Sequence, residues 1–501
     1  MDLFYSIGLL VTIFIGILYY SVTTFDFWTR QGIYTDKNLI PIFGNALPVL
    51  LMRKNLSMLC NEACKNLSAN KSLIGMFFMQ TPLLVIRDPE LIKNVFIKHF
   101  NYFRNNALYV NARDDPFMVK NPFFAVDESW KQNRAYLVSK MSPKKLKTLF
   151  LIISDISIKF KNYLKELFKN EESNIVVELK TVIMKFTGEI VASTAFGIEG
   201  QGFNNDRDPD CFSVKLEHFL QPTYLSGVKE TIRFYFPNLA SFLRIGFLPK
   251  KLSIFLLKTI EDVFNYRVKK QIVINDLLQM AIESTDNPNL EVVSAHVSAY
   301  FFDAYETSAT IASFACYNLA YYPDIQEKTR KHIEKVLNDH DFRLSIEALR
   351  DMFYLDQVIN ETIRLHPILG INIRSCNQDI SLQSSDGQNV HIKSGNLLCI
   401  PVQSIHTDEK YWKNPFFFDP DRFSEDRKKE IVKFTFLPFG EGPRICAGKN
   451  YGIMIVKVAL IIILKDFIIK GLQEKMPAMT YDHRSFLTAS KDGLQVQLIK
   501  R

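Results

Sequence analysis

The sequence predicts a mostly α-helical protein with small β-sheets, formed as one large domain behind an amino-terminal transmembrane helix. Three observations carry this prediction. The chain begins with a long apolar stretch that carries no charge after Asp2, from residue 3 to residue 22. Apolar residues then recur at helical spacing through most of the 501 residues. Runs with the alternation or composition of strands are short and few.

The amino-terminal apolar stretch predicts a retained membrane anchor at residues 1–22. Residues 3–22, "LFYSIGLLVTIFIGILYYSV", carry no charge, and as a helix they would span roughly 30 Å, the thickness of a bilayer's hydrocarbon core. The stretch lacks the basic start and small-residue cleavage site of a signal peptide. Arg30 and Lys37 follow it, so the positive-inside rule predicts that the bulk of the chain is cytosolic.

Residues 23–50 are predicted to form a hinge, because "LIPIFGNALP" contains Pro41, Gly44 and Pro48, which break regular structure. No later linker, repeat or low-complexity stretch divides the chain. We therefore expect residues 51–501 to form a single domain.

The apolar pattern within that domain predicts specific elements. Helices are expected at 144–169, 252–284, 291–321 and 449–468, and strands at 73–78, 82–87 and 396–401. The run "VALIIIL" in the last of these helices is too short to cross a membrane, so we expect that helix to be buried.

Composition narrows the possible functions. Apolar residues make up 47% of the chain and Phe occurs 41 times, which predicts a large core rich in aromatic packing. The net charge of +8 forms no Arg/Lys-rich block, which argues against nucleic acid as a partner. The seven cysteines are irregularly spaced without a CxxC pair, which argues against a zinc site or a disulfide framework and favours a reducing compartment.

Residues 233–251, "RFYFPNLASFLRIGFLPKK", depart from the pattern of a soluble protein because aromatic, basic and proline residues are mixed. Two interpretations remain open. The segment is an ordinary loop over the core, or it makes a second, monotopic contact with the membrane surface.

The stretch 436–452, "FLPFGEGPRICAGKNYG", predicts a ligand site around one cysteine. Gly440 and Gly442 permit a tight turn. Cys446 follows at the expected start of a helix, where amide N–H groups and the positive helix end favour a thiolate. Arg444 adds a cation, and Gly448 leaves room for a flat group to pack closely. A thiolate beside an arginine suggests a metal whose cofactor carries carboxylates.

The full spacing F-x-x-G-x-R-x-C-x-G, from Phe439 to Gly448, resembles the cytochrome P-450 haem-thiolate monooxygenases. The resemblance covers nearly the whole chain. It is strongest to insect microsomal members that handle foreign chemicals, in "STAFGI", "FPNLASFLRIGFLPKKL" and "FFFDPDRF". It implies the cytochrome P-450 fold and haem b (iron protoporphyrin IX) as cofactor. Cys446 would be the axial ligand of the iron, with Phe439, Arg444 and Gly448 as further cofactor-binding residues.

"NETIRLHP" places Glu361 and Arg364 three residues apart on one helical face, in an apolar setting that predicts burial. "NPFFFDPDRF" supplies Arg422. The resemblance implies that these three residues form a structural network that stabilises the haem-side core.

"DESWKQNR" contains Trp130 and Arg134 at helical i, i+4 spacing, so an indole N–H and a guanidinium can both donate to one carboxylate. The alternative is a packed tryptophan beside a solvated arginine. The resemblance implies that both residues bind haem propionates, together with Arg374 in "NIRSC" and Arg444.

"FFDAYETSAT", residues 301–310, lies within the long predicted helix and places Glu306 beside Thr307. A threonine inside a helix usually bonds only to its own backbone. The resemblance implies instead that Thr307 and Glu306 are catalytic and help to deliver protons during the activation of dioxygen.

This chain departs from the family pattern at Asp303 and Ala304, which replace a small residue and a glycine. Asp303 lies four residues before Thr307 and should share its helix face. An acid in an apolar site is costly unless it is neutral or paired. Three interpretations stay open: contact with a cationic or hydroxylated substrate, an ester to a haem methyl group, or a locally rewound helix that turns the acid away.

The resemblance implies a monooxygenase that inserts one oxygen atom from O2 into a lipophilic molecule, by hydroxylation, epoxidation or dealkylation. Xenobiotics, endogenous lipids and hormones are the expected substrate classes. Two alternatives remain open: a haem-thiolate isomerase or dehydratase that needs no external electrons, and a haem-binding sequestration protein without turnover. The first is disfavoured by Glu306–Thr307, since such relatives often lack the acid–alcohol pair.

No dinucleotide or flavin motif is present, so electrons must come from another protein. The resemblance implies NADPH–cytochrome P-450 reductase, with cytochrome b5 as a possible second donor, at the endoplasmic reticulum membrane. Lys131 and Lys449 are candidates for contact with an acidic flavoprotein. An ordinary solvated basic surface is the alternative.

Overall fold

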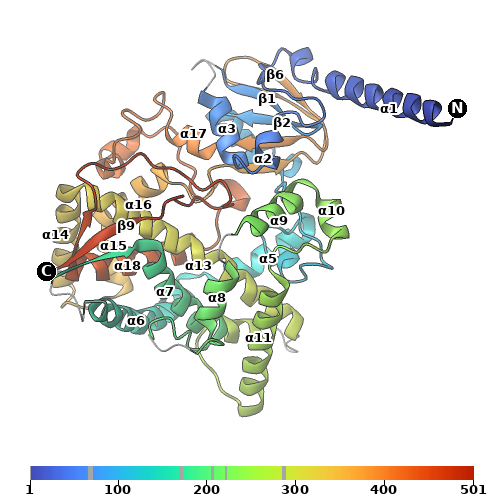
Figure 1. Cartoon of the computed structure of the whole chain (residues 1–501). Helices are drawn as coiled ribbons and strands as arrows, with labels where there is room; N and C mark the ends of the chain where they lie inside the picture. The colour runs from blue at the N-terminus through green and yellow to red at the C-terminus, as the bar shows by residue number, and fades with distance from the viewer. Residues whose placement is uncertain (1, 66–70, 169–172, 205–207, 221–222, 285–288) are drawn as a thin grey trace. The chain divides into compact units, whose positions relative to one another are not determined.

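Segments far apart in the sequence assemble into two units in the computed structural model, which describes residues 2–65, 71–168, 173–204, 208–220, 223–284 and 289–501. Unit 1 consists of Met1–Leu108, Leu369–Pro415 and Ile431–Ile445. Unit 2 consists of Tyr109–Ile368, Phe416–Glu430 and Cys446–Arg501. The chain is mostly helical with small sheets, as predicted (Figure 1).

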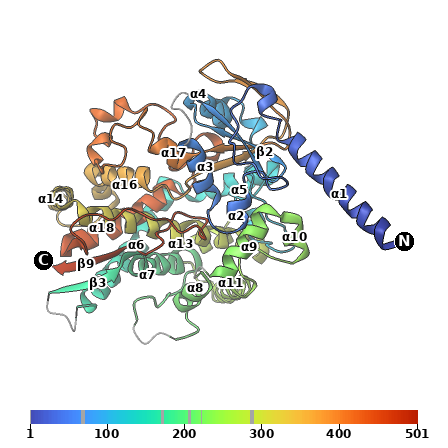
Figure 2. The same ribbon diagram turned by 45° about the horizontal axis from the view of Figure 1, so that its top comes forward.

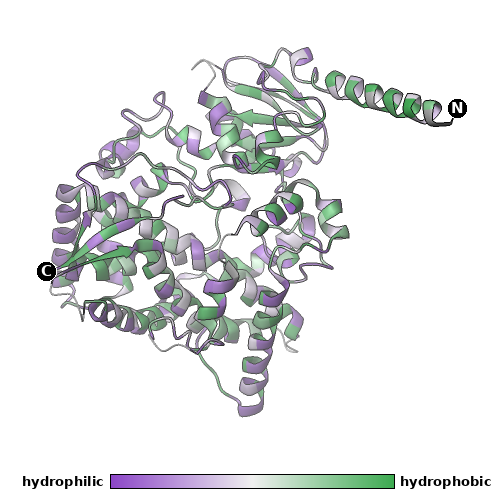
Figure 3. Ribbon diagram, in the orientation of Figure 1, coloured by the Kyte–Doolittle hydropathy of each residue, from purple (hydrophilic) through white to green (hydrophobic). Residues whose placement is uncertain are grey.

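The apolar amino-terminal stretch of unit 1 forms the helix α1, Asp2–Thr24. It projects from the sheet of unit 1, and apolar residues run along its length (Figure 3). Large apolar side chains such as Phe4 and Leu10 are exposed, which is costly in water and favourable in lipid. The segment Phe4–Gln31 is long and apolar enough to cross a membrane.

Unit 1 is built on a four-stranded sheet in the order β1-β2-β7-β4. The strands β1 and β2 pair antiparallel, β2 and β7 pair parallel, and β7 and β4 pair antiparallel. Trp28, from the segment expected to be a hinge, is fully buried against this sheet and donates from Nε1 to the carbonyl of Met76 at 3.0 Å. Gly75 lies beneath the indole, where a Cβ would come within 2.5 Å of Trp28.

Apart from α1, the helices of unit 1 are short. Its strands are β1 (Leu73–Phe78), β2 (Thr81–Ile86), β4 (Asn372–Ser375), β5 (Ile380–Gln383), β6 (Asn389–Ile392) and β7 (Leu397–Ile400). Its remaining helices are η1 (Thr29–Gln31), α2 (Leu47–Leu50), α3 (Leu56–Lys65), α4 (Pro89–Lys93), η2 (Asn94–Lys98), η3 (Phe100–Tyr102), α17 (Val402–His406) and η8 (Gly442–Arg444).

Unit 2 is organised around the helix α13, Leu290–Tyr321, whose residues from Val293 to Phe301 are all buried. The helices α7, Leu179–Val191, and α18, Lys449–Asp466, pack against it (Figures 1 and 2). A helix enclosed on most sides has apolar residues all around it rather than on one stripe. This explains why α13 and α18 carry apolar residues around most of their circumference without crossing a membrane.

The other elements of unit 2 enclose these three helices. They are η4 (Met118–Lys120), α5 (Asp127–Lys140), α6 (Pro143–Glu166), η5 (Ala192–Phe196), α8 (Phe212–Leu220), α9 (Tyr224–Tyr235), α10 (Pro237–Phe242), α11 (Lys250–Lys270), α12 (Leu277–Ile282), α14 (Pro323–Asp339), α15 (Ile346–Asp351), α16 (Phe353–Leu365), η6 (Pro420–Phe423) and η7 (Arg427–Glu430). The strands β3 (Asn174–Glu178), β9 (Gln495–Lys500) and β8 (Phe467–Gly471) form an antiparallel sheet in that order.

One predicted helix is wrong as a continuous element. The expected helix at 252–284 is divided into α11 and α12. Gln271 ends α11 in the left-handed conformation with φ of 55°, and Asp276 caps α12 by accepting from the amide of Gln279 at 2.8 Å. Asp276 also binds Arg267 of α11 through two buried hydrogen bonds. The apolar pattern continues across the break, because both helices face the same core.

The remaining boundaries agree closely with the expected ones. The helices α6 and α13 and the strands β1, β2 and β7 match their expected ranges within a few residues. The last predicted helix ends at Asp466, because Phe467 already begins β8.

Candidate functional site

Cys446 belongs to unit 2 and lies three residues before α18, which begins at Lys449. It is therefore not the first residue of the helix, as the sequence suggested, and Gly448 is the N-cap. A hydrogen bond with the Gly448 backbone nevertheless lowers the pKa of the Cys446 thiol. The amide end of the helix is thus directed at the sulfur, as expected for an anionic ligand.

Burial outweighs that amide and raises the pKa of Cys446 to about 11. The charge of Asp303 raises it further, whereas Arg134 and Lys449 lower it. The residue is nevertheless accessible to solvent, so its sulfur faces space that a ligand can reach although protein atoms crowd around it. Without a metal the thiol is protonated, whereas a metal ion would displace the proton.

The turn before Cys446 belongs to unit 1 and depends on its glycines. Gly440 and Gly442 have φ of 69° and 72°. A Cβ at Gly442 would lie 2.2 Å from the carbonyl oxygen of Phe96, so only glycine fits there. Phe439 is half-buried beside this turn. By contrast, a Cβ at Gly448 would meet nothing within 4 Å, which leaves one side of the loop open.

Unit 1 contains two of the predicted cofactor-binding arginines. Arg374 is buried, and burial lowers its pKa to about 10. Its guanidinium donates to the neutral side-chain oxygen of Asn106, and it forms no ion pair among the described residues. Arg444 donates from Nε to the carbonyl of Arg104. Neutral acceptors thus hold these two cations in position.

Unit 2 contains the other predicted pair, on α5. Trp130 is buried, and Arg134, one turn later, is half-buried. Burial lowers the pKa of Arg134, and the charge of Cys446 raises it. Arg134 forms no ion pair within the described part of the chain. A partly desolvated guanidinium near the cysteine is suited to a bound anionic group.

These residues fit a haem with two propionates. The residues offer one soft sulfur ligand on an accessible loop. They also offer Arg134 and Arg374, two partly or fully buried guanidiniums that form no ion pair in the described part of the chain. The open side of Gly448 accommodates a flat group.

Glu361, Arg364 and Arg422 lie together in unit 2. Glu361 and Arg364, both on α16, are fully buried. Arg364 donates from Nε and Nη2 to the two carboxylate oxygens at 2.7 and 2.8 Å. Arg422 donates from Nε to Oε1 of Glu361 at 3.3 Å. The backbone amide of Asp419 also donates to Oε1 at 2.9 Å, so the buried carboxylate is well satisfied.

The acid–alcohol pair of α13 is held by two different contacts. Oε1 of Glu306 lies 2.6 Å from Nζ of Lys180 on α7. Thr307 donates from Oγ1 to the carbonyl of Asp303 at 2.6 Å. Lys180 was not predicted from the sequence, since it lies 126 residues away and stands in no recognisable motif.

Asp303 accepts a hydrogen bond at Oδ1 from Nδ2 of Asn121, at 3.1 Å. The helix α13 is a regular α-helix across this position, so it is not rewound in the way that one interpretation required. Burial raises the pKa of Asp303 to about 6, and the Asn121 hydrogen bond lowers it. Asn121 was also missed, because nothing in its local sequence connects it to the long helix.

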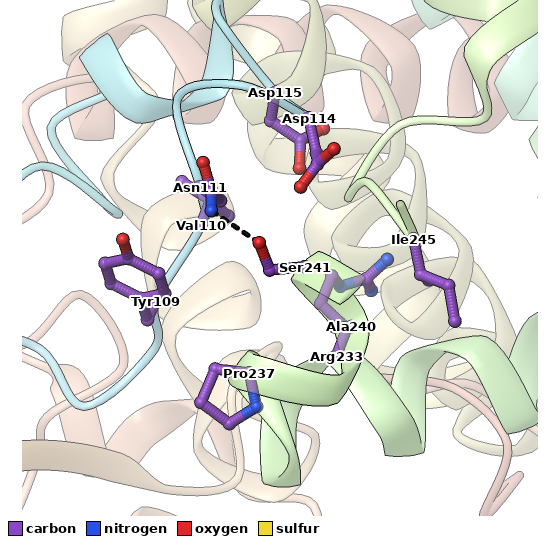
Figure 4. A pocket seen from close by; sticks show the side chains of 10 residues that line it. All are labelled: Tyr109, Val110, Asn111, Asp114, Asp115, Arg233, Pro237, Ala240, Ser241 and Ile245. Carbon is purple, nitrogen blue, oxygen red and sulfur yellow. Dashed lines mark hydrogen bonds between the residues drawn. The ribbon is translucent and has the colours of Figure 1, made fainter. Parts of the chain in front are cut away.

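A small recess in unit 2 is lined by side chains from residues 109–115 and from α9 and α10 (Figure 4). Asn111 donates across it to Oγ of Ser241 at 2.8 Å. On the same segment, Asp115 accepts from the amides of Phe247 and Leu248 at 2.6 and 3.1 Å. The recess has room for about one water molecule, so it is a polar junction and not a substrate site.

Comparison with known proteins agrees with this geometry. The Cytochrome P450 family model matches residues 36–496. Cytochrome P450 6j1 of Blattella germanica is 30% identical over 99% of this chain and 97% of its own length. Probable cytochrome P450 6a14 of Drosophila melanogaster is 30% identical over 98% of both chains. Probable cytochrome P450 9f2 of the same species is 29% identical over 95% of both.

The chain belongs to the cytochrome P450 family. It is an oxidoreductase of the haem-thiolate monooxygenase class, which uses O2 and a redox partner. Its cofactor is haem, held in this family through a cysteine thiolate. Its amino-terminal apolar helix has the character of a membrane anchor.

Proposed function

We propose that this protein is a microsomal monooxygenase that inserts one oxygen atom from O2 into lipophilic xenobiotics or endogenous lipids. Residues 51–501 would act as one catalytic domain behind the anchor at 1–22 and the connecting segment 23–50. Cys446 carries the proposal, because it is the described cysteine that combines solvent access with a helix amide directed at its sulfur.

Cys446 would ligate the haem iron, while Trp130, Arg134, Arg374 and Arg444 would bind the propionates. Bound in this way, haem would supply the activation of dioxygen and the transfer of one oxygen atom to a C–H bond or a double bond. The chain itself would exclude water, orient the substrate and supply protons.

Proton supply is the role we propose for Glu306 and Thr307. The Thr307 hydroxyl is fixed by its hydrogen bond to the carbonyl of Asp303. Glu306 is half-buried and held by Lys180. A carboxylate that a flexible lysine holds can exchange protons with water on one side and with a hydroxyl on the other. An isomerase or a sequestration protein would not need Glu306 and Thr307 to deliver protons.

Electrons would come from NADPH–cytochrome P450 reductase, with cytochrome b5 as a second donor. Lys131 on α5 is exposed, with an ion pair of 3.8 Å to Glu128. Lys449 is exposed at the start of α18, and its charge lowers the pKa of Cys446. Lys131 shares α5 with Trp130 and Arg134, and Lys449 directly follows Gly448. An acidic flavoprotein would therefore dock beside the proposed haem-binding residues.

The charge reversals Lys131→Glu and Lys449→Glu test this contact. Reductase-supported turnover should fall at low salt, and its dependence on ionic strength should weaken. Lys258→Glu, an exposed lysine on α11, is the matched control. Unchanged turnover and salt dependence in both test variants would rule out docking at this surface.

The endoplasmic reticulum membrane is the proposed location, with the catalytic domain on the cytosolic side. Besides α1, the helix α10 offers a second membrane contact. Its Phe242 is 81% exposed and its Leu239 is 43% exposed, and Arg244 and Lys250 follow as exposed basic residues. Apolar and basic side chains in this arrangement suit an interfacial helix beside anionic lipid.

The reduced carbon monoxide complex tests the central assignment. Full-length, haem-loaded protein should give the long-wavelength Soret band of a thiolate-ligated haem. Cys446→Ser should lose that band, whereas Cys211→Ser, at a half-buried cysteine of the same unit, should keep it. NADPH consumption with reductase then separates a monooxygenase from an isomerase or a sequestration protein. A wild-type protein without the thiolate band would refute the proposed function.

A further inference from the structure

Two acids on α13 lie three residues apart and differ in their electrostatic partners. Glu306 is neutralised by Lys180 at 2.6 Å. Among the described residues, Asp303 forms no ion pair, and its carboxyl group accepts one side-chain hydrogen bond, from Asn121. A carboxylate without a counter-charge in a crowded site is costly. The Asp303 carboxylate does not stabilise the fold, so a functional reason for it is needed.

The carboxyl group of Asp303 has a fixed orientation. Asn121 is fully buried, and its Oδ1 accepts from the amide of Phe123 at 2.7 Å. That bond identifies the other end of the carboxamide as the NH2 group, which donates to Oδ1 of Asp303. One carboxylate oxygen is thus held by a rigid donor, while Oδ2 accepts no hydrogen bond from the described residues.

Asp303 also faces space that a ligand can reach. The residue is exposed to solvent, although the surrounding protein is dense enough to raise its pKa. The charge of Asp303 acts on the Cys446 thiol and raises its pKa. The two side chains thus lie in one electrostatic environment, on the side of α13 where the proposed chemistry takes place.

The chain segments that carry Asp303 and Asn121 also contribute to a cluster of aromatic rings. Phe123 follows Asn121 by two residues, and Phe302 precedes Asp303. The rings of Phe302 and Phe247 are 4.7 Å apart, centre to centre. Further rings link into the same cluster: Phe124 to Phe247 at 4.7 Å, Phe234 to Phe486 at 5.1 Å and Phe123 to Phe486 at 6.2 Å. Most of these rings are only half-buried. The Arg233 guanidinium already lies over the rings of Phe234 and Phe247, 4.7 and 4.4 Å from their centres.

An anionic group beside accessible aromatic faces is the combination that binds an organic cation. The carboxylate supplies the charge, and the ring faces that Arg233 does not cover bind the alkyl groups around the nitrogen. A neutral hydrocarbon gains binding free energy only from contact with the rings, because it carries no positive charge to neutralise the Asp303 carboxylate.

We propose that Asp303, oriented by Asn121, is a specificity-determining residue that binds the cationic nitrogen of lipophilic amine substrates. This inference rests on the proposed function, since it assigns a substrate class to the same site. Such an anchor would fix the distance between the nitrogen and the carbon atom to be oxidised. It predicts that amines and their neutral isosteres are discriminated at the binding step.

Equilibrium dialysis of full-length, haem-loaded protein tests this inference without relying on turnover. The probe is trimethyl(phenylbutyl)ammonium, whose nitrogen has no lone pair and cannot ligate iron. The comparison ligand is its neutral isostere, in which carbon replaces the nitrogen. Wild-type protein should prefer the cation, and Asp303→Asn should reduce that preference by about tenfold or more. Asp262→Asn, an exposed aspartate on α11, should leave it unchanged.

Two further measurements make the outcome decisive. Asp303→Glu retains the charge, so it should retain most of the preference and shows that the site tolerates substitution. Haem extracted with acid from wild-type protein should be unmodified, since an ester would consume the Asp303 carboxylate. Haem that stays covalently attached in wild-type protein but not in Asp303→Asn would overturn the inference.

The failure of this inference is distinguishable from failure of the proposed function. Loss of the thiolate band in wild-type protein would refute the monooxygenase assignment. A normal band, together with the same cation preference in wild-type and Asp303→Asn proteins, would refute the role of Asp303 alone.

Discussion

The Nζ atom of Lys180 lies 2.6 Å from Oε1 of Glu306, so helix α7 holds the acid that precedes Thr307 on helix α13. The ion pair is partly buried, and it connects two helices that pack along much of their length. Glu306 therefore does not move freely as a surface carboxylate would. Its position beside the threonine depends on a residue of another helix.

Glu306→Gln should reduce product formation by about 100-fold, because an amide cannot exchange protons. Lys180→Met should cause a smaller loss, of about tenfold, since the acid remains but loses the group that holds it. Product formed per NADPH, with its solvent deuterium isotope effect, measures both. Lys185→Met, on the same helix with its amine over the ring of Tyr163, is the control. Wild-type values in Glu306→Gln would contradict the proposed proton path.

Glu361→Gln should destabilise the protein by about 3–5 kcal/mol, because Arg364 and Arg422 would remain buried without their anion. The expected result is little or no folded, haem-loaded protein after expression. Glu425→Gln removes an i, i+3 partner of Lys428 at the surface and should leave the stability nearly unchanged, because solvent screens that pair. Equal yields of the two variants would show that the buried network is dispensable.

His366 should make the protein sensitive to mild acid. Burial, with a smaller effect from Arg364, lowers its pKa from 6.5 to about 3. Below about pH 6.5 the unfolded chain binds a proton that the folded chain excludes. The free energy of unfolding therefore falls by about 1.4 kcal/mol per pH unit.

Thermal unfolding measured between about pH 7 and pH 5 checks this. His366→Phe, which preserves the stacking on Phe314, should show a shallower loss of stability, with a difference of about 2 kcal/mol at pH 5. Tyr481→Phe removes only the hydroxyl 2.9 Å from Nδ1 and should keep the wild-type pH dependence. Parallel profiles for wild-type and His366→Phe would contradict the prediction.

Asp115 should control the local stability of the segment before α11. Its carboxylate accepts from the amides of Phe247 and Leu248, while Arg233 donates to the carbonyls of Gly246 and Phe247 at 3.1 and 3.2 Å. Asp115→Ala should accelerate hydrogen exchange at the two amides by about tenfold to 100-fold. Asp114→Ala removes a neighbouring acid that does not bind those amides, and unchanged exchange in both variants would refute the role.

The fold class was predictable because it depends on local patterns. The helix α13 follows from apolar spacing that is nearly continuous from Leu290 to Tyr321. The break between α11 and α12 was not predictable from the sequence. Glutamine is not a residue type that favours the left-handed backbone conformation found at Gln271. The ion pair between Asp276 and Arg267 forms only once the two helices are in place. A local pattern cannot indicate that two helices bury the same face.

The candidate site likewise contains residues that the sequence predicted and residues that only the structure revealed. Cys446, Glu361 and Thr307 stand in motifs whose spacing alone indicated them. Lys180 and Asn121 act through contacts that span 126 and 182 residues. Such partners emerge only when the helices pack, since any lysine or asparagine would have looked the same in the sequence.

The sheet of unit 1 has a consequence for biosynthesis. The strands β1 and β2 are complete by Ile86, whereas β7, which pairs with β2, begins only at Leu397. The strand β4, which pairs with β7, begins at Asn372. A ribosome that adds about 5–20 residues per second needs roughly 15–60 s to reach the missing strands. During that interval β2 exposes an unpaired edge, so nascent chains of this protein should depend on chaperones until the later strands emerge.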